Sequence, residues 1–354
     1  MSNLELDGHK LHLHPVVVAR WLQGKNIAPI YLETGLTSLC NCHCAFCAFE
    51  YLRPTNAQLE PSVLLPFLTE AHAKGLRSVL ISGEGEPLLH PEVANLVPAI
   101  RALGLDLALT TNGLLLNEAL ATALLPSLTW LRVSLNAGSA STYARLHGVP
   151  EHCFDQVLQN LGVLVERKKV LGVSCTVGVQ VVTVPENVGE LEALAPRLRY
   201  LGVDYFSIKP YSPHPGNVSR ELDRCLTTAD QELETALARW NTADFTVYYR
   251  AESMRRTTLP KPYDRCLGQA FAAFVMASGE VYPCHTFVGD RDYLLGDLHL
   301  DSAEEILFGA RRTALLRRFA EEHDLGRCRS ACRLDALNRY LWLLRHPSAH
   351  VNFI

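Results

Sequence analysis

Short apolar runs alternate with helical stretches through the first two-thirds of the chain, and this alternation constrains the fold more than any other feature. Apolar runs cover residues 30–33, 78–81, 107–110, 130–134, 177–182 and 205–208. Helical periodicity covers residues 61–74 and 157–168, and glycines stand at 75, 104 and 202, where helices would end. This pattern is typical of parallel strands joined by crossover helices. We therefore predict an α/β fold with six parallel strands.

Polar, glycine-containing segments follow four of these runs, at residues 37–47, 82–87, 110–113 and 134–138. In barrels built from strand–helix units, the chemistry lies at the carboxyl ends of the strands. The functional groups are therefore expected in these four loops.

The alternation ends after residues 210–216, which are rich in proline. A helix is expected around 230–240, a strand over 245–249, a hairpin turn at 278–280 and a further helix over 304–319. We predict three parts: a lead-in segment (1–28), a barrel (29–216) and a smaller C-terminal domain (217–354).

Composition excludes some partners. Hydrophobic residues make up 48% of the 354 residues and the formal net charge is −4, which supports a buried core and argues against binding to nucleic acid. The sequence has neither a run of about 20 apolar residues nor the features of a signal peptide. We expect a cytoplasmic protein without a membrane partner, in which regularly spaced cysteines bind metal.

Cys40, Cys44 and Cys47 form a Cys-x3-Cys-x2-Cys motif after the first strand. Three thiolates at this spacing can hold three corners of a cubane cluster and leave one iron open to a small molecule. The alternative is a zinc knuckle, but such sites usually close with a second pair of ligands, and none lies nearby. Cys42 fits no alternative spacing and is interpreted as a bystander.

The motif, with Phe46 just before its last cysteine, resembles the signature of the radical S-adenosylmethionine (SAM) superfamily over residues 29–212. The resemblance implies a partial (β/α)6 barrel in which SAM binds the open iron of a [4Fe-4S] cluster. It also implies cleavage of SAM to a 5′-deoxyadenosyl radical that abstracts hydrogen from the substrate, and an external electron donor such as a flavodoxin or ferredoxin.

Three further segments are similar to the SAM-binding elements of that family. Residues 82–87 (Ser-Gly-Glu-Gly-Glu-Pro) resemble its Gly-Gly-Glu-Pro element, with Glu84 in place of the first glycine. Ser134 and Asn136 resemble its ribose and carboxylate contacts, and alternation on the strand turns them inward with Arg132. Simple turns could also explain Thr111, Ser134 and Asn136. The candidate SAM-binding residues are Phe46, Gly85, Glu86, Pro87, Thr111, Ser134 and Asn136.

Alternation along the first and sixth strands identifies residues that would face the substrate if those faces point inward. Tyr31 and Glu33 share a face of the first strand, and Ser207, Lys209 and Tyr211 share a face of the sixth. Tyr31, Glu33, Lys209 and Tyr211 are the candidates for the substrate cavity, although a lone lysine is more often solvated.

A second group of cysteines, Cys266, Cys284, Cys328 and Cys332, brackets the expected hairpin and follows the last expected helix. Four thiolates can saturate a [4Fe-4S] cluster, and four cysteines in two pairs also describe a structural zinc site. The arrangement after such a barrel resembles the twitch domain, a shortened SPASM domain, and is similar to that of the aminocyclitol dehydrogenase of butirosin biosynthesis. The resemblance implies one auxiliary [4Fe-4S] cluster in a small α+β domain.

These patterns together favour a radical SAM oxidoreductase acting on a hydroxylated small molecule, such as a sugar, an aminocyclitol or a nucleoside. The alternatives are a peptide-modifying or maturase enzyme, and an epimerase in which Cys153, Cys175 or Cys225 returns a hydrogen atom. A free cysteine is more often a small buried hydrophobe, and none of these three falls at the catalytic end of a strand. A non-enzymatic iron–sulfur carrier would not need an open iron inside a barrel.

Overall fold

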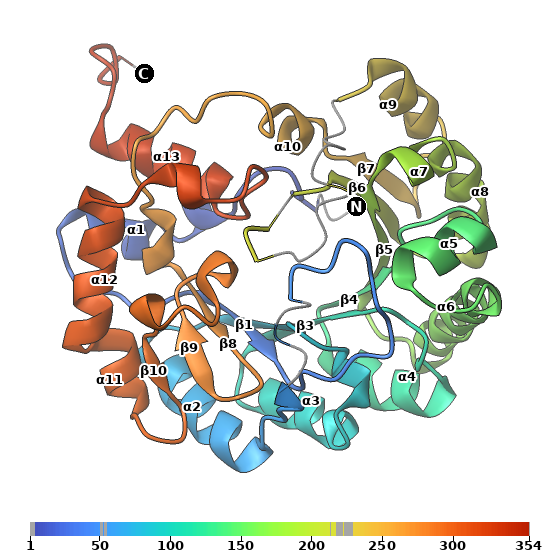
Figure 1. Ribbon diagram of the computed structural model, residues 1–354, viewed down its shortest axis with the longest axis horizontal. Coiled ribbons are helices and arrows are strands. Elements are labelled where there is room, and N and C mark those ends of the chain that lie inside the picture. Colours follow the sequence, from blue (N-terminus) through green and yellow to red (C-terminus); the bar gives the residue numbers. More distant parts are fainter. Residues whose placement is uncertain are drawn as a thin grey trace.

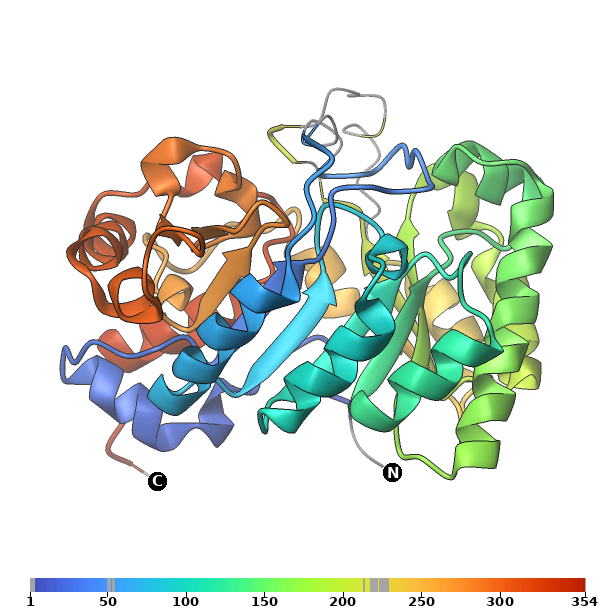
Figure 2. The ribbon, with the colours of Figure 1, turned by 90° about the horizontal axis from the view of Figure 1, so that it is seen from below.

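The strands form one sheet that curves into an open ring (Figures 1 and 2). The computed structural model describes residues 4–353 except 50, 51, 53, 54, 213, 217–221 and 223–228. In this part of the chain the sheet has ten strands in the order β10-β9-β8-β1-β2-β3-β4-β5-β6-β7. Their bounds are β1 Tyr31–Gly35, β2 Ser78–Ser82, β3 Asp106–Thr111, β4 Trp130–Ser134, β5 Thr176–Thr183, β6 Tyr205–Pro210, β7 Thr246–Tyr249, β8 Ala272–Val275, β9 Glu280–Tyr282 and β10 Gly296–Asp297.

Strands β1 to β6 pair in parallel in chain order, which confirms the six predicted parallel strands. Two later strands extend this sheet at its ends: β7 pairs in parallel with β6, and β8 pairs in parallel with β1. Strands β8 and β9 form the predicted antiparallel hairpin. Strand β7 lies after residue 216 and still joins the barrel sheet, so this sheet continues past the predicted domain boundary. The boundary at residue 216 therefore stays a prediction.

Helices cover the outer side of the ring, and the C-terminal helices gather beside β8 to β10 (Figures 1 and 2). The bounds are α1 Pro15–Leu22, α2 Pro61–Lys74, α3 Val93–Ala102, α4 Glu118–Leu124, α5 Ala140–His147, α6 His152–Leu171, α7 Pro185–Val188, α8 Leu191–Leu201, α9 Gln231–Ala238, α10 Ala251–Arg255, α11 Ala303–Phe308, α12 Ala310–Glu321 and α13 Asp335–Arg345. No helix in the described ranges is long and apolar enough to cross a membrane.

The predicted helix over 304–319 is instead two helices, α11 and α12. Gly309 separates them with an extended backbone (ψ 171°). A capping box between Ser302 and Glu305 starts α11, and Arg312 on α12 is buried and donates to the carbonyls of Ile27, Leu307 and Ala270. The break thus lets Arg312 join the lead-in segment to the C-terminal domain.

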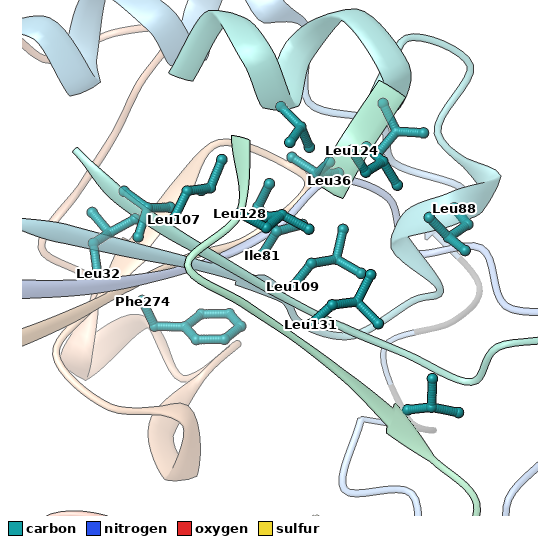
Figure 3. Close-up of a cluster of buried hydrophobic side chains, with 14 of the residues drawn as sticks. Leu32, Leu36, Ile81, Leu88, Leu107, Leu109, Leu124, Leu128, Leu131 and Phe274 are labelled. Carbon is teal, nitrogen blue, oxygen red and sulfur yellow. The ribbon is translucent and has the colours of Figure 1, made fainter. Parts of the chain in front are cut away.

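The main core lies between the sheet and its helices. Strand side chains alternate, so Leu107 and Leu109 of β3 and Leu131 of β4 are buried in it (Figure 3). Side chains of opposite parity turn to the inside of the ring, where Trp130, Arg132 and Ser134 line a cavity. This alternation leaves the inner face free for polar chemistry.

Candidate functional site

A cavity of about 560 Å³ opens inside the ring, and both groups of cysteines reach it. Cys44 and Cys47 line it from the loop after β1, and Cys284 and Cys332 line it from the C-terminal domain. The rest of the wall comes from the inner faces and carboxyl ends of the strands, as predicted for the chemistry of such a fold.

The loop carrying Cys40, Cys44 and Cys47 is fixed by the end of α5. The backbone N–H groups of His43 and Ala45 donate to the carbonyls of His147 (2.8 Å) and Leu146 (3.0 Å). The Sγ of Cys44 lies 3.5 Å from Nδ1 of His147. Burial lowers the pKa of His147 to about 4, so this ring is neutral at physiological pH and adds no positive charge beside the thiol.

Cys42 is fully buried between Cys40 and Cys44 and does not line the cavity. A side-chain hydrogen bond with Cys42, followed by burial, raises the pKa of Cys40. In the described residues, no three Cys, His, Asp or Glu side chains lie close enough together to hold a single metal ion. The assignment of Cys40, Cys44 and Cys47 as ligands of a larger cluster remains a prediction from their spacing.

The Gly-Glu-Gly-Glu-Pro loop after β2 packs directly on the first cysteine loop. A Cβ at Gly85 would lie 2.1 Å from the carbonyl oxygen of Thr37 and 2.4 Å from that of Leu39, so only glycine fits here. The N–H of Glu86 donates to the same Leu39 carbonyl at 2.8 Å. This close approach holds Glu86 beside the cysteine loop.

The Glu86 carboxylate is buried and organises the loop after β3. It accepts hydrogen bonds from Oγ1 of Thr111 (2.6 Å) and from the N–H groups of Asn112 (2.7 Å) and Leu88 (3.1 Å). Burial raises the pKa of Glu86, and the three hydrogen bonds lower it by a smaller amount. A carboxylate has room for a fourth donor, so Glu86 can still accept from an ammonium group in the cavity that it lines.

Glu84 stands where the similar Gly-Gly-Glu-Pro element has its first glycine. It joins the barrel to the C-terminal domain. Its Oε1 accepts from the N–H of Ala277 at 2.7 Å, while its Oε2 is buried without a hydrogen-bond partner. Burial raises the pKa of Glu84 to about 7. The residue therefore serves an interdomain contact that a glycine could not make.

The other candidate SAM-binding residues divide into two sets. Phe46, Thr111, Ser134 and Asn136 line the cavity with Gly85 and Glu86, whereas Pro87 is buried at the start of a short 3-10 helix and does not line it. Asn136 has a positive φ of 53°, and its Oδ1 accepts from the N–H of Val182 at 2.8 Å. Their roles toward SAM stay predictions.

All four substrate-cavity candidates, Tyr31, Glu33, Lys209 and Tyr211, line the cavity. Ser207 shares a strand with Lys209 but is buried and does not line it. Glu33 is 3% exposed and accepts from Tyr31 Oη (3.2 Å), Ser82 Oγ and His285 Nε2 (2.9 Å). Burial, followed by the charges of Arg329 and Lys209, lowers the pKa of His285 to about 3, so His285 is neutral and donates.

The second group of cysteines converges in the C-terminal domain. Burial raises the pKa of Cys332 well above its ordinary value, and the charges of Cys284, Cys266 and Cys328 raise it further. Three of the sulfurs have nitrogen neighbours: Asn338 Nδ2 donates to Cys266 (3.5 Å), the N–H of Thr286 donates to Cys284 (3.4 Å), and His323 Nε2 lies 3.3 Å from Cys328. Hydrogen bonds to sulfur are one means by which proteins tune iron–sulfur clusters, so these residues fit a cluster as the sequence predicts.

Several cavity residues gave no local sequence signal. His147, His285, Arg329 and Arg333 are isolated polar residues, and Arg333 forms an ion pair with Glu33 from 300 residues away in the chain. Three of them directly follow a predicted cysteine ligand, His285 after Cys284, Arg329 after Cys328 and Arg333 after Cys332, and these positions were the available hint.

Two family models match separate parts of the chain. The Radical SAM superfamily profile matches residues 35–195, and a profile described as an iron–sulfur cluster-binding domain matches residues 266–333. The first range contains Cys40, Cys44 and Cys47, and the second contains the other four predicted ligands.

Curated relatives carry different activities. A probable GTP 3′,8-cyclase of Saccharolobus solfataricus is 33% identical over 131 residues, which is 37% of this chain and 42% of that protein; the chain thus spans less than half of this relative. A tungsten-containing aldehyde ferredoxin oxidoreductase cofactor-modifying protein of Pyrococcus furiosus is 26% identical over 277 residues, covering 75% of this chain and 74% of that protein.

Solved structures share the fold. Streptococcus suis SuiB bound to the precursor peptide SuiA aligns over 98% of this chain and 81% of its own, with a TM-score of 0.67 and 18% identity. The complex of BtrN with AdoMet and 2-DOIA aligns with a TM-score of only 0.39 and 13% identity, which supports no inference about substrate.

Proposed function

This chain carries a radical SAM domain and an iron–sulfur cluster-binding domain, and we propose that it uses them to oxidise a hydroxylated small molecule. SAM, a radical SAM [4Fe-4S] cluster and an auxiliary iron–sulfur cluster are the cofactors of these two domains. When bound, SAM and the first cluster supply a 5′-deoxyadenosyl radical that abstracts hydrogen from the substrate.

The observation that carries this proposal is one cavity that both groups of cysteines line. A substrate in that cavity lies within reach of both groups, so hydrogen abstraction at one end can be followed by electron removal toward the other. The protein would bind and orient SAM through Glu86, Ser134 and Asn136, and orient the substrate from Tyr31, Glu33, Lys209 and Tyr211. An external flavodoxin or ferredoxin would supply the electron that starts the reaction.

Cavity size supports a small substrate. Pockets for a single small ligand are typically about 300–1,000 Å³, and the cavity of about 560 Å³ must also accept SAM. The remaining space suits a sugar-sized or nucleoside-sized molecule. An epimerase is less well supported, because Cys153 and Cys175 are buried and do not line the cavity, and Cys225 lies outside the described residues.

Peptide modification is the second candidate. SuiB, whose structure is described as bound to a precursor peptide, shares the fold over almost the whole chain. A peptide could enter the cavity by one side chain, so a substrate test must include peptides as well as small molecules.

The test is anaerobic reconstitution with iron and sulfide, followed by reduction with dithionite in the presence of SAM and measurement of 5′-deoxyadenosine by liquid chromatography and mass spectrometry. Wild type should release 5′-deoxyadenosine, Cys44→Ala should release none, and Cys175→Ala, a buried cysteine remote from the cavity, should match wild type. Small hydroxylated molecules should increase the release in a substrate screen. An increase with peptides alone would replace the proposal with peptide modification.

A further inference from the structure

The cavity wall is far more basic than the chain as a whole. Among the described lining residues six are cationic and three are carboxylates, although the chain has a net charge of −4. The cations are Arg132, Lys209, Arg250, Arg256, Arg329 and Arg333, and the carboxylates are Glu33, Glu86 and Asp335.

The three carboxylates already have partners, and the one acceptor site left on Glu86 is the site expected to bind the ammonium group of SAM. Glu33 pairs with Arg333, and Asp335 pairs with Arg256 (3.7 Å) and Arg339 (2.8 Å). Glu86 accepts its three hydrogen bonds from the strand-end loops. Lys209, Arg132 and Arg329 therefore have no carboxylate partner on the described wall, and Arg250 has only Asp7 from the lead-in segment, at 3.6 Å.

Three guanidinium groups on this wall also leave hydrogen-bond donors unused. The Nε atoms of Arg132, Arg250 and Arg329 are buried and have no hydrogen-bond partner. Within the described residues the ammonium group of Lys209 has no ion pair or hydrogen bond. Burial, followed by the charges of Arg132, Arg250 and Arg329, lowers the pKa of Lys209 well below its ordinary value, so an anion beside Lys209 would favour its charged form. Burying cations without partners is costly, and an anion among them would offset that cost.

The cofactors account for two of these cations. Arg329 lies beside Cys284 and Cys332, so its charge can balance the thiolates of the auxiliary cluster. Arg132 lies on β4 with Ser134 and can meet the carboxylate of SAM. Lys209 and Arg250 remain: they sit on β6 and directly after β7, side by side, since the N–H of Arg250 donates to the carbonyl of Ile208.

We propose that the substrate carries a carboxylate or a phosphate group, and that Lys209 and Arg250 bind this anion. The proposal rests on the proposed function and narrows its substrate class. It favours a sugar acid, a sugar phosphate or a nucleotide, and it excludes an aminocyclitol, whose ammonium groups would face cations without free carboxylates.

Four matched probes test the inference: glucose, glucosamine, glucuronate and glucose 6-phosphate, which share one ring and differ in charge. Binding to the reconstituted, SAM-loaded enzyme is measured by anaerobic calorimetry without reductant, so the result does not depend on turnover. Glucuronate or glucose 6-phosphate should bind at least about 10-fold more tightly than glucose, and more weakly as salt rises. Glucosamine should bind no better than glucose. Whichever of glucuronate and glucose 6-phosphate binds more tightly shows whether the site prefers a carboxylate or a phosphate.

Variants assign the effect to the two cations. Lys209→Met and Arg250→Gln should each lose most of the preference for the acidic probe while keeping wild-type iron content and SAM affinity. Lys169→Met, which removes a lysine exposed on α6, is the matched control and should keep the preference. Equal binding of charged and neutral probes, or an equal loss in the Lys169 control, would overturn the inference. Release of 5′-deoxyadenosine, measured separately, shows whether the proposed function stands without it.

Discussion

Replacing Glu84 with glutamine should make the protein more stable, and the gain should grow with pH. The Glu84 carboxylate is 3% exposed, with one oxygen bonded to the N–H of Ala277 and the other without a partner. Burial raises its pKa from 4.5 to about 7 in the folded protein. Glutamine keeps the acceptor for Ala277 and removes the buried charge.

The sign and size of this stability difference follow from the linkage between protonation and folding. Between pH 4.5 and 7 the unfolded chain releases the Glu84 proton while the folded chain keeps it, so wild-type stability falls across this window and then levels off above pH 7. A pKa difference of about 2.5 corresponds to about 3 kcal/mol. The advantage of Glu84→Gln should therefore be near zero below pH 4.5 and about 3 kcal/mol above pH 7.

Anaerobic thermal unfolding of the reconstituted protein from pH 5 to 8 measures this difference. At roughly 2 °C per kcal/mol for a large domain, the melting temperature of Glu84→Gln should exceed that of wild type by roughly 6 °C at pH 8 and by much less at pH 5. Glu321→Gln, at an exposed carboxylate on α12, should show no such trend. A gap that does not change with pH would refute the burial argument.

Three further predictions concern the cysteines and SAM. Wild type should bind about eight irons per chain and the triple variant Cys40/Cys44/Cys47→Ala about four, by iron assay; about four irons and one zinc in wild type would instead favour the zinc site. Cys266→Ala and Cys284→Ala should stop substrate turnover, whereas Cys153→Ala, Cys175→Ala and Cys225→Ala should keep it, and a loss in one of the last three with 5′-deoxyadenosine still formed would favour epimerisation. Glu86→Gln should weaken SAM binding by about 1–3 kcal/mol in calorimetry, the range for a lost charge-assisted hydrogen bond; unchanged affinity would remove Glu86 from the site.

The sequence predicted the parts of this protein that depend on local patterns. The six strands, α2 and the β8–β9 hairpin all follow from apolar runs, helical periodicity and turn residues within a few positions. The inward face of β4 was also predictable, because alternation on a strand fixes which side chains point the same way.

The missed parts depend on contacts between distant segments. His285 meets Glu33 across 252 positions, and Ala277 meets Glu84 across 193. No local pattern distinguishes such a histidine or glutamate from a solvated one. The strands β7 and β8 were missed as members of the barrel sheet for the same reason, since their pairing with β6 and β1 is decided by tertiary packing.

The pairing of β8 with β1 fixes how the two groups of cysteines face each other. The first group lies beyond Gly35, at the carboxyl end of β1, whereas β9 runs back along β8, so that Phe274 pairs with Tyr282 and Cys284 follows two residues later. Cys284 is therefore level with the start of β1, near Tyr31. At about 3.3 Å per residue, the strand between these levels is about 13 Å long. Glu33 lies at the middle of that length and contacts His285 and Arg333, which adjoin Cys284 and Cys332. Loss of Glu33 should accordingly disturb the C-terminal cysteines, because its carboxylate holds both His285 and Arg333 to the barrel.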